Sequence, residues 1–290
     1  MNISTRALRT RVAAVAATSV LLIGAAAAAP ALASTSLGTS HSTPSHSAPK
    51  PTVVLVHGAW ADSSSWSAVT ARLQHDGYNV LVPPVSLTDL NADAGALAAY
   101  LAQRTTGPVV LVGHSYGGAV VTDAGASDPD VKALVYVDAF IPDQGQSLGS
   151  LLAGTGSPFD TTSVDPTTVF DFTGLPGGDP TDPQVYLKPT AFFGDFAQDL
   201  PHQQAAVLEA GQLPISAAAL GEAATAPAWK TVPSWAVVGT QDKVIPPAAQ
   251  LAMATHAGAR IATVRASHVS LVSQPAAVAN VIEKAAASVH

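Results

Sequence analysis

This chain of 290 residues contains no cysteine. It therefore has no disulfide bond, no thiolate nucleophile and no cysteine ligand for a metal ion, and its stability depends on its core. Basic residues are also few, with 13 Lys and Arg against 20 Asp and Glu and a net charge of −7. Because an acidic surface does not attract nucleic acids or anionic membranes, neither is an expected partner.

The first 33 residues have the pattern of a cleavable signal peptide. Arg6, Arg9 and Arg11 form a basic start, residues 12–29 are uncharged and apolar, and Ala31-Leu32-Ala33 is a small-residue cleavage site. The apolar stretch is mostly alanine, so cleavage is favoured over retention as a membrane anchor. We expect a secreted protein, with no membrane segment after cleavage. Its net charge falls to −10, because three arginines and no acidic residue leave with the leader.

The rest of the chain divides into a linker and one domain. Residues 34–50 are rich in Ser, Thr and Pro, which predicts a disordered linker, and residues 51–290 are long enough for a substantial core. Apolar runs predict strands at 53–56, 78–82, 109–112, 133–137, 235–238 and 260–264. Helices are expected between them, one capped by Ser64 or Ser65 and others at 89–104, 118–126 and 275–287. This alternation is typical of an α/β fold with a mostly parallel sheet covered by helices on both faces.

The segment from about residue 140 to 229 breaks this alternation. Its first half is rich in Gly, Pro, Asp and Thr, and its second half carries several phenylalanines and an alanine-rich stretch. An insertion of this length between two strands is typical of a cap over a functional site. The alternative is an extended surface excursion with small helices of its own.

The strongest functional signal is the run Pro108-Val-Val-Leu-Val-Gly-His-Ser-Tyr-Gly-Gly118. It predicts a strand, a sharp turn with Ser115 at its apex, and a helix. Gly113 and Gly117 are required because a Cβ at either position would collide with the strand or the helix. The turn presents the Ser115 hydroxyl beside a helix N-terminus, where backbone N–H groups stabilise negative charge. Ser115 is therefore the predicted nucleophile.

A serine nucleophile needs a base to take its proton and an acid to orient that base. Asp242 follows the predicted strand at 235–238, and His268 follows the strand at 260–264. Since the carboxyl ends of parallel strands lie at one edge of a sheet, both side chains are expected near Ser115. Asp138 also follows a strand and is the alternative acid. Asp242 is favoured because Asp138 leads directly into the insertion.

Acyl transfer also requires N–H donors for a developing oxyanion. The N–H of Tyr116, at the start of the predicted helix, is one candidate. The second is the N–H of Ala59, because Gly58 allows the loop after the first strand to turn close to the serine. The pair His57-Gly58 is also compatible with a simple turn at the end of a strand.

The other histidines are interpreted without a catalytic role. His202 and His256 are expected at the surface, His75 near a helix end, and His114 holding the serine turn while pointing away from the hydroxyl. His41 and His46 lie in the polar linker, where solvated side chains are expected rather than a metal site. No metal site is predicted.

Four segments together resemble the α/β-hydrolase superfamily, in particular its small esterase-like branch with plant methyl-ester esterases and hydroxynitrile lyases. They are Val53-Val-Leu-Val-His-Gly-Ala-Trp60, Gly113-His-Ser-Tyr-Gly117, Gly239-Thr-Gln-Asp242 and Ser267-His268. The resemblance implies an α/β-hydrolase fold with an inserted cap, the nucleophile Ser115, the base His268, the acid Asp242, and oxyanion donors at Ala59 and Tyr116. It implies no metal and no organic cofactor.

Two departures from the family pattern matter. The chain lacks the first two antiparallel strands that larger members carry. Val269 stands where hydroxynitrile lyases have a lysine, which argues against cyanohydrin cleavage.

The expected function is a secreted serine hydrolase that cleaves small carboxylic esters through an acyl-enzyme. Ser115 argues against epoxide hydrolases and haloalkane dehalogenases, which resemble this fold but use aspartate at that position. A perhydrolase or lyase would use the same triad. A non-catalytic protein would bind a small apolar ligand under the cap, although it would need no triad. Six aromatic residues either line a substrate pocket or pack the cap onto the sheet: Trp60, Tyr116, Phe140, Phe192, Phe193 and Phe196.

Overall fold

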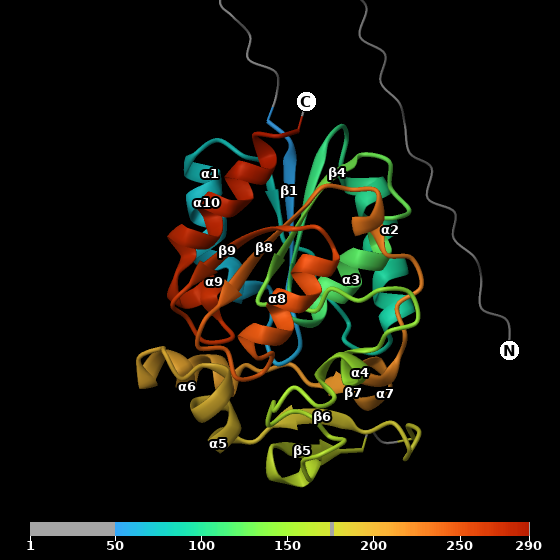
Figure 1. Cartoon of the computed structure of the whole chain (residues 1–290), viewed down its shortest axis with the longest axis vertical. Coiled ribbons are helices and arrows are strands. Elements are labelled where there is room, and N and C mark those ends of the chain that lie inside the picture. The colour runs from blue at the N-terminus through green and yellow to red at the C-terminus, as the bar shows by residue number, and fades with distance from the viewer. Residues whose placement is uncertain (1–49, 175–176, 290) are drawn as a thin grey trace, which may run out of the picture. The chain divides into compact units, whose positions relative to one another are not determined.

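The computed structural model describes residues 50–174 and 177–289 (Figure 1). The predicted signal peptide at 1–33 and all but the last residue of the predicted linker at 34–50 lie outside the described residues. No helix in the described part of the chain is both long enough and apolar enough to span a membrane.

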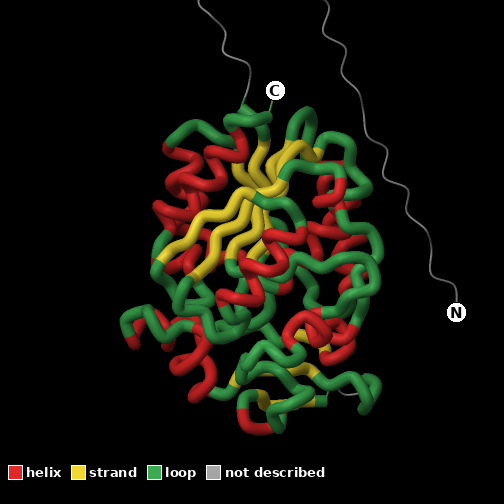
Figure 2. The backbone as a smooth tube through the Cα atoms, viewed as in Figure 1, coloured by secondary structure: helices red, strands yellow, loops and turns green. Residues whose placement is uncertain are grey.

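The central sheet has six strands, in the order β2-β1-β3-β4-β8-β9, and every neighbouring pair is parallel (Figures 1 and 2). The strands are β1 (Thr52–Val56), β2 (Val80–Leu81), β3 (Val109–His114), β4 (Val131–Val137), β8 (Ser234–Gly239) and β9 (Arg260–Val264). All residues of β1, β3 and β8 are buried. Their continuous apolar runs are explained by this position, because both faces of the sheet are covered.

Helices cover both faces of the sheet (Figure 1). On one face lie α1 (Ser67–His75), α9 (Ser270–Ser273) and α10 (Pro275–Ala286), and on the other lie α2 (Leu90–Arg104), α3 (Tyr116–Ala124) and α8 (Pro247–His256). The predicted fold class is confirmed by this architecture. Because the strands are parallel, all their carboxyl ends point to the same end of the molecule, the lower end in Figure 1.

The start of the first helical segment differs from the expectation. A 3₁₀ turn (Ser63–Trp66) precedes α1, and its cap is Asp62, whose carboxylate accepts the Ser64 N–H at 2.7 Å. The expected cap at Ser64 or Ser65 is therefore wrong by two or three residues. A short acidic side chain placed before the turn supplies the acceptor for the free N–H groups of the first turn.

The chain between β4 and β8 forms the inserted cap (Figure 2). It contains an antiparallel sheet of β5 (Phe170–Thr173), β6 (Gln184–Leu187) and β7 (Ile215–Ser216). Four short helices accompany it: α4 (Leu148–Leu152), α5 (Pro189–Ala191), α6 (His202–Ala210) and α7 (Ala217–Gly221). A π-helical turn (Phe192–Phe196) follows α5. This segment lies across the carboxyl ends of the central strands, as expected of a cap.

Candidate active site

Ser115 lies at the sharp turn between β3 and α3, with left-handed backbone angles of φ 53° and ψ −123°. Such a conformation costs a non-glycine residue about 1–3 kcal/mol, so surrounding contacts must enforce it. The Ser115 N–H donates to the Val137 carbonyl at 3.3 Å. The Ser115 carbonyl accepts the N–H groups of Gly118 at 2.9 Å and Phe140 at 3.2 Å. The end of β4 and the first turn of α3 therefore hold the turn in place.

Close packing explains the glycines of this turn. A Cβ on Gly113 would lie 2.4 Å from the carbonyl oxygen of Gly117, and a Cβ on Gly117 would lie 2.7 Å from that of His57. A Cβ on Gly58 would lie 2.6 Å from the Cβ of Ser115. These separations are shorter than carbon contacts allow, so the loop after β1 approaches the serine only because these positions lack side chains.

The structure brings Ser115, His268 and Asp242 together. His268 Nε2 lies 2.8 Å from Ser115 Oγ, and His268 Nδ1 lies 2.8 Å from Asp242 Oδ2. All three side chains are buried. They come from the turn after β3, the loop after β9 and the loop after β8, which meet at the carboxyl edge of the sheet.

The surroundings of Asp242 orient its carboxylate. Oδ1 accepts the N–H groups of Val244 at 2.8 Å and Ile245 at 3.0 Å, and Oδ2 accepts the side-chain amide of Gln250 at 2.7 Å. Burial raises the pKa of Asp242, and these donors act against that rise because they stabilise the ionised form. The carboxylate is therefore held by three donors in addition to the imidazole of His268.

Burial lowers the pKa of the His268 imidazole below its ordinary value of 6.5. The ring is therefore neutral in the resting site. Its hydrogen bond to the Asp242 carboxylate assigns the proton to Nδ1, which leaves the lone pair of Nε2 facing Ser115 Oγ. This tautomer is the one that accepts a proton from the hydroxyl.

Asp138, the alternative acid, is buried but contacts other groups. Its Oδ1 accepts the Gly239 N–H at 2.8 Å, and its Oδ2 accepts the Ser270 N–H at 3.0 Å. Gly239 ends β8 just before the loop of Asp242, and Ser270 lies two residues beyond His268. Burial, and then the charge of Asp242, raise the pKa of Asp138. Its carboxyl group thus links the two loops, a contact that no sequence pattern indicates.

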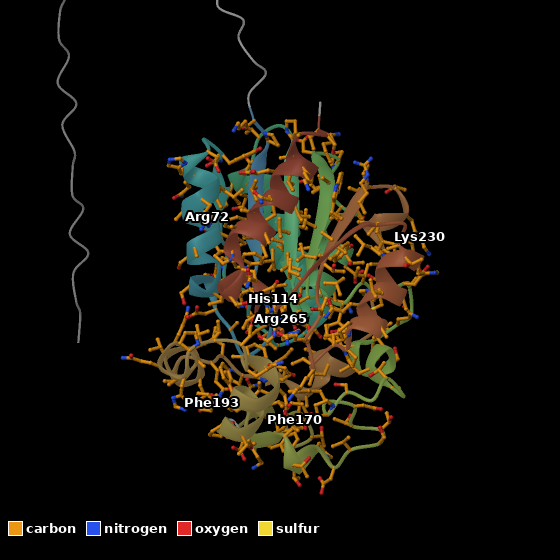
Figure 3. All side chains as sticks on the ribbon, turned by 60° about the vertical axis from the view of Figure 1, so that its left-hand side comes forward. Arg72, His114, Phe170, Phe193, Lys230 and Arg265 are labelled. Carbon is orange, nitrogen blue, oxygen red and sulfur yellow. The ribbon has the colours of Figure 1, made fainter. Side chains whose placement is uncertain are left out.

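Two further histidines lie next to the triad. His114 Nε2 donates to the carbonyl oxygen of His268 at 2.8 Å, and the two rings lie 5.0 Å apart. His114 therefore positions the backbone of the loop that carries His268. His57 Nε2 accepts the Val85 N–H at 3.0 Å and orders the loop beside β1. Figure 3 labels His114, together with Arg265 just beyond β9, at this end of the sheet.

The remaining described histidines are exposed, as the sequence indicates for His202 and His256. His75 Nδ1 lies 3.0 Å from Oδ1 of Asp76, the ring of His202 stacks 4.7 Å from that of Phe193, and His256 lies near Asp143. Among residues 50–174 and 177–289, no group of three or more His, Asp or Glu side chains is arranged to hold a metal ion.

The candidate oxyanion donors lie beside the serine. Ala59 and Tyr116 line the same cavity as Ser115. Tyr116 is the first residue of α3, where an N–H has no acceptor within the helix. The Tyr116 hydroxyl donates to Asp93 at 2.8 Å, which holds the ring in place. The donor role of the two N–H groups stays a prediction.

A cavity of about 60 Å³ adjoins Ser115. Residues of the sheet edge and of the cap line it together: Ala59, Trp60, Ser115, Tyr116, Phe140, Leu148, Gly149, Leu152, Phe159, Thr161, Phe170, Leu220 and Val244. None of these residues is charged, and most are apolar. The cavity therefore favours an uncharged, apolar group next to the hydroxyl.

The six aromatic residues divide between the two expected uses. Trp60, Tyr116 and Phe140 line the cavity at Ser115. Phe192 and Phe196 are buried with their ring centres 4.8 Å apart, and the ring of Phe196 also lies 5.2 Å from that of His268. This pair therefore packs the cap onto the sheet edge. The ring of Phe193, also in the cap, stacks on the exposed ring of His202.

Residues 53–281 match the model of the alpha/beta hydrolase family. Because this match covers most of the chain, the protein belongs to that family. The predicted resemblance to α/β-hydrolases is thus confirmed.

Several characterised proteins are similar to this chain. The carbendazim hydrolyzing esterase of Nocardioides sp. (strain SG-4G) is 36% identical over 113 residues, which cover 34% of this chain and 46% of that protein. Methylesterase 8 of Arabidopsis thaliana is 32% identical over 123 residues, 37% of this chain and 45% of that protein. These matches span less than half of each relative. Their names agree with the predicted esterase-like branch.

A solved structure supports the fold over a longer range. An extracellular alpha/beta-hydrolase from a Paenibacillus species superposes with a TM-score of 0.68 at 22% sequence identity. The superposition covers 81% of this chain and 98% of that one. At this identity the likeness concerns the fold alone.

Proposed function

We propose that this protein is a serine hydrolase that cleaves small, uncharged carboxylic esters through an acyl-enzyme intermediate. The proposal depends above all on the hydrogen-bond chain from Ser115 Oγ through His268 to Asp242, with both contacts at 2.8 Å. Nucleophilic catalysis by serine needs this chain, whereas the binding of a ligand does not. The names of the two esterase relatives support the same class of reaction.

In the acylation step, His268 Nε2 takes the proton of Ser115 as Oγ attacks the ester carbonyl carbon. The imidazolium that forms is stabilised by Asp242 through Nδ1–H. The carbonyl oxygen gains negative charge and accepts the N–H groups of Ala59 and Tyr116. His268 then returns the proton to the departing alcohol oxygen, which leaves the acyl group on Ser115.

In the deacylation step, His268 takes a proton from a water molecule, and the resulting hydroxide attacks the acyl carbon. The Oγ–carbon bond breaks, Ser115 recovers a proton from His268, and the carboxylic acid leaves. The apolar, uncharged lining of the cavity supports an apolar substrate. Apart from the ester and this water molecule, the steps use side chains and backbone groups of this chain.

The test is the hydrolysis of p-nitrophenyl acetate and butyrate by the wild-type protein and by Ser115→Ala, with Ser127→Ala as the matched control. Ser127 is exposed and lies in the turn between α3 and β4. We expect Ser115→Ala to lose at least about a thousandfold in kcat and Ser127→Ala to match the wild type. Equal turnover by Ser115→Ala would eliminate the mechanism. Binding of the esters without turnover by the wild type would favour a binding protein.

We also propose that the protein is exported and that residues 1–33 are removed. The basic start, the apolar stretch and the small residues before Ser34 support this proposal. Sequencing the N-terminus of protein recovered from the culture medium tests it. A mature chain beginning at Ser34 is expected, and a protein that stays cell-associated with Met1 intact would contradict it.

A further inference from the structure

A second apolar space adjoins the cavity at Ser115. It is a more open groove of about 320 Å³ lined by residues of the cap. Nine residues line it: Gly149, Thr161, Pro166, Phe170, Phe172, Val185, Ala217, Leu220 and Gly221. Four of them, Gly149, Thr161, Phe170 and Leu220, also line the cavity. The two spaces therefore adjoin, and these four residues form a shared wall between them.

Phe170 is the rigid part of the wall. Its side chain is buried, and its ring centre lies 5.6 Å from that of Trp60 and 5.7 Å from that of Phe159. On the groove side its ring packs edge-on against Phe172, which is 42% exposed. Figure 3 shows Phe170 in the cap, beyond the sheet end marked by His114. Truncating Phe170 would disturb the whole aromatic cluster.

Leu220 is the thin part of the wall. It is only half-buried and lies in α7, a helix of five residues that packs beside α4. On the facing side, Gly149 of α4 has no side chain, and a Cβ there would meet only the Leu220 carbonyl oxygen, at 3.7 Å. Because Leu220 is only partly buried, removing its side chain is expected to open a passage at a smaller loss of core packing than truncating Phe170.

The cavity is small for an ester substrate. Its volume of about 60 Å³ is less than half of the roughly 150 Å³ of an apolar protein cavity that binds benzene. An acyl chain of about two to four carbons fills a space of this size. The next carbons of a longer chain would meet the shared wall, with the 320 Å³ groove behind it.

We propose that Leu220 sets the acyl-chain length of this enzyme. With Leu220 in place, the cavity admits esters of short aliphatic acids. Once the passage is open, the outer groove receives the distal carbons of a longer aliphatic acyl chain. An aliphatic acyl chain fits this groove because the groove adjoins the cavity at Ser115 and both spaces have uncharged linings. This inference rests on the proposed function.

The experiment measures kcat/KM for p-nitrophenyl acetate, butyrate, hexanoate, octanoate and dodecanoate. Leu220→Ala is compared with the wild type and with Leu251→Ala, the same substitution at an exposed position of α8. Each methylene that enters an apolar site is expected to raise kcat/KM about fourfold. Octanoate has four more carbons than butyrate, so Leu220→Ala is expected to gain on the order of a hundredfold on octanoate. The wild type and Leu251→Ala should favour acetate or butyrate.

Three additional variants make the test specific. Gly149→Leu added to Leu220→Ala returns side-chain volume to the passage and should restore the short-chain preference. Phe172→Ala added to Leu220→Ala removes part of the groove and should lower octanoate hydrolysis about tenfold while leaving acetate unchanged. Leu220→Val gives a smaller shift, toward hexanoate, and serves if Leu220→Ala does not fold.

Several results would overturn the inference while leaving the proposed function intact. One is a wild-type enzyme that already prefers octanoate. Another is a Leu220→Ala profile that matches Leu251→Ala. A third is a Leu220→Ala enzyme whose preference shifts with the length of the alcohol, measured with alkyl acetates of increasing length, and not with the length of the acyl chain. Failure of the proposed function is recognised separately, because Ser115→Ala would then hydrolyse every ester as the wild type does.

Discussion

The substitution Asp138→Asn tests how the loops of the active site are held together. The Asp138 carboxylate accepts one N–H from Gly239 and one from Ser270, next to the loops of Asp242 and His268. Asparagine has a single oxygen, so one of the two N–H groups would face an amide NH₂ instead of an acceptor. A hydrogen bond to a charged group contributes about 1.5–3 kcal/mol. One such contact is lost.

Two consequences are expected, one on stability and one on catalysis. A loss of about 2 kcal/mol lowers Tm by roughly 4–8 °C for a domain of this size. A small displacement of the His268 or Asp242 loop lowers kcat by about 10–100-fold, because the proton transfers depend on close alignment. KM should stay nearly unchanged, since Asp138 does not line the cavity at Ser115.

The assay is steady-state ester hydrolysis combined with thermal unfolding of the same preparations. Asp171→Asn is the control, because Asp171 is exposed and pairs with Lys188 at the surface. Asp138→Ala removes both acceptors and should be more severe than Asp138→Asn. The reasoning is refuted if Asp138→Asn lowers Tm while kcat stays at the wild-type value, because its role would then be structural only. An effect confined to KM would refute it as well.

Three further predictions follow from the same structure. Burial lowers the pKa of His268, and only the neutral ring takes the serine proton. The pH profile of kcat/KM should therefore rise with pH through a midpoint below 6.5, and a midpoint above 6.5 would contradict this. In steady-state kinetics, Asp242→Asn should lower kcat on the order of 10⁴-fold, because the wrong tautomer of His268 is then favoured. A loss in kcat below tenfold would argue against Asp242 as the acid. In thermal unfolding, Gly117→Ala should lower Tm by about 3–10 °C, because its Cβ would lie 2.7 Å from a backbone oxygen. Gly95→Ala, in open space on α2, should raise Tm by about 2–4 °C. Equal shifts in the two variants would disprove the steric argument.

Much of the fold and the candidate site follows from local patterns. Each central strand except β2 is a run of at least five residues, and such runs stand out in the sequence. In a parallel sheet their carboxyl ends share one edge, so the positions after three strands indicated Ser115, Asp242 and His268. The turn at Ser115 carried its own local signal, because glycines stand at the two positions where a Cβ would collide with the neighbouring backbone.

Other features had no local signal. The contacts of Asp138 join residues 101 and 132 positions apart, which no periodic pattern encodes. The only available hint was an acidic residue at the end of a strand. The short strands of the cap, four, four and two residues long, were also missed, because alternation is not recognisable over so few positions. The shared wall at Leu220 likewise depends on α7 packing beside α4, which sequence spacing does not reveal.

The central claim is that the Ser115 hydroxyl is a nucleophile activated by His268. The most direct measurement is the mass of the protein after incubation with an organophosphonate probe, followed by peptide mapping. We predict a single adduct on the peptide that contains Ser115, slower labelling of His268→Ala, and no adduct on Ser115→Ala. An unmodified wild-type protein, or equal labelling of Ser115→Ala, would contradict the account.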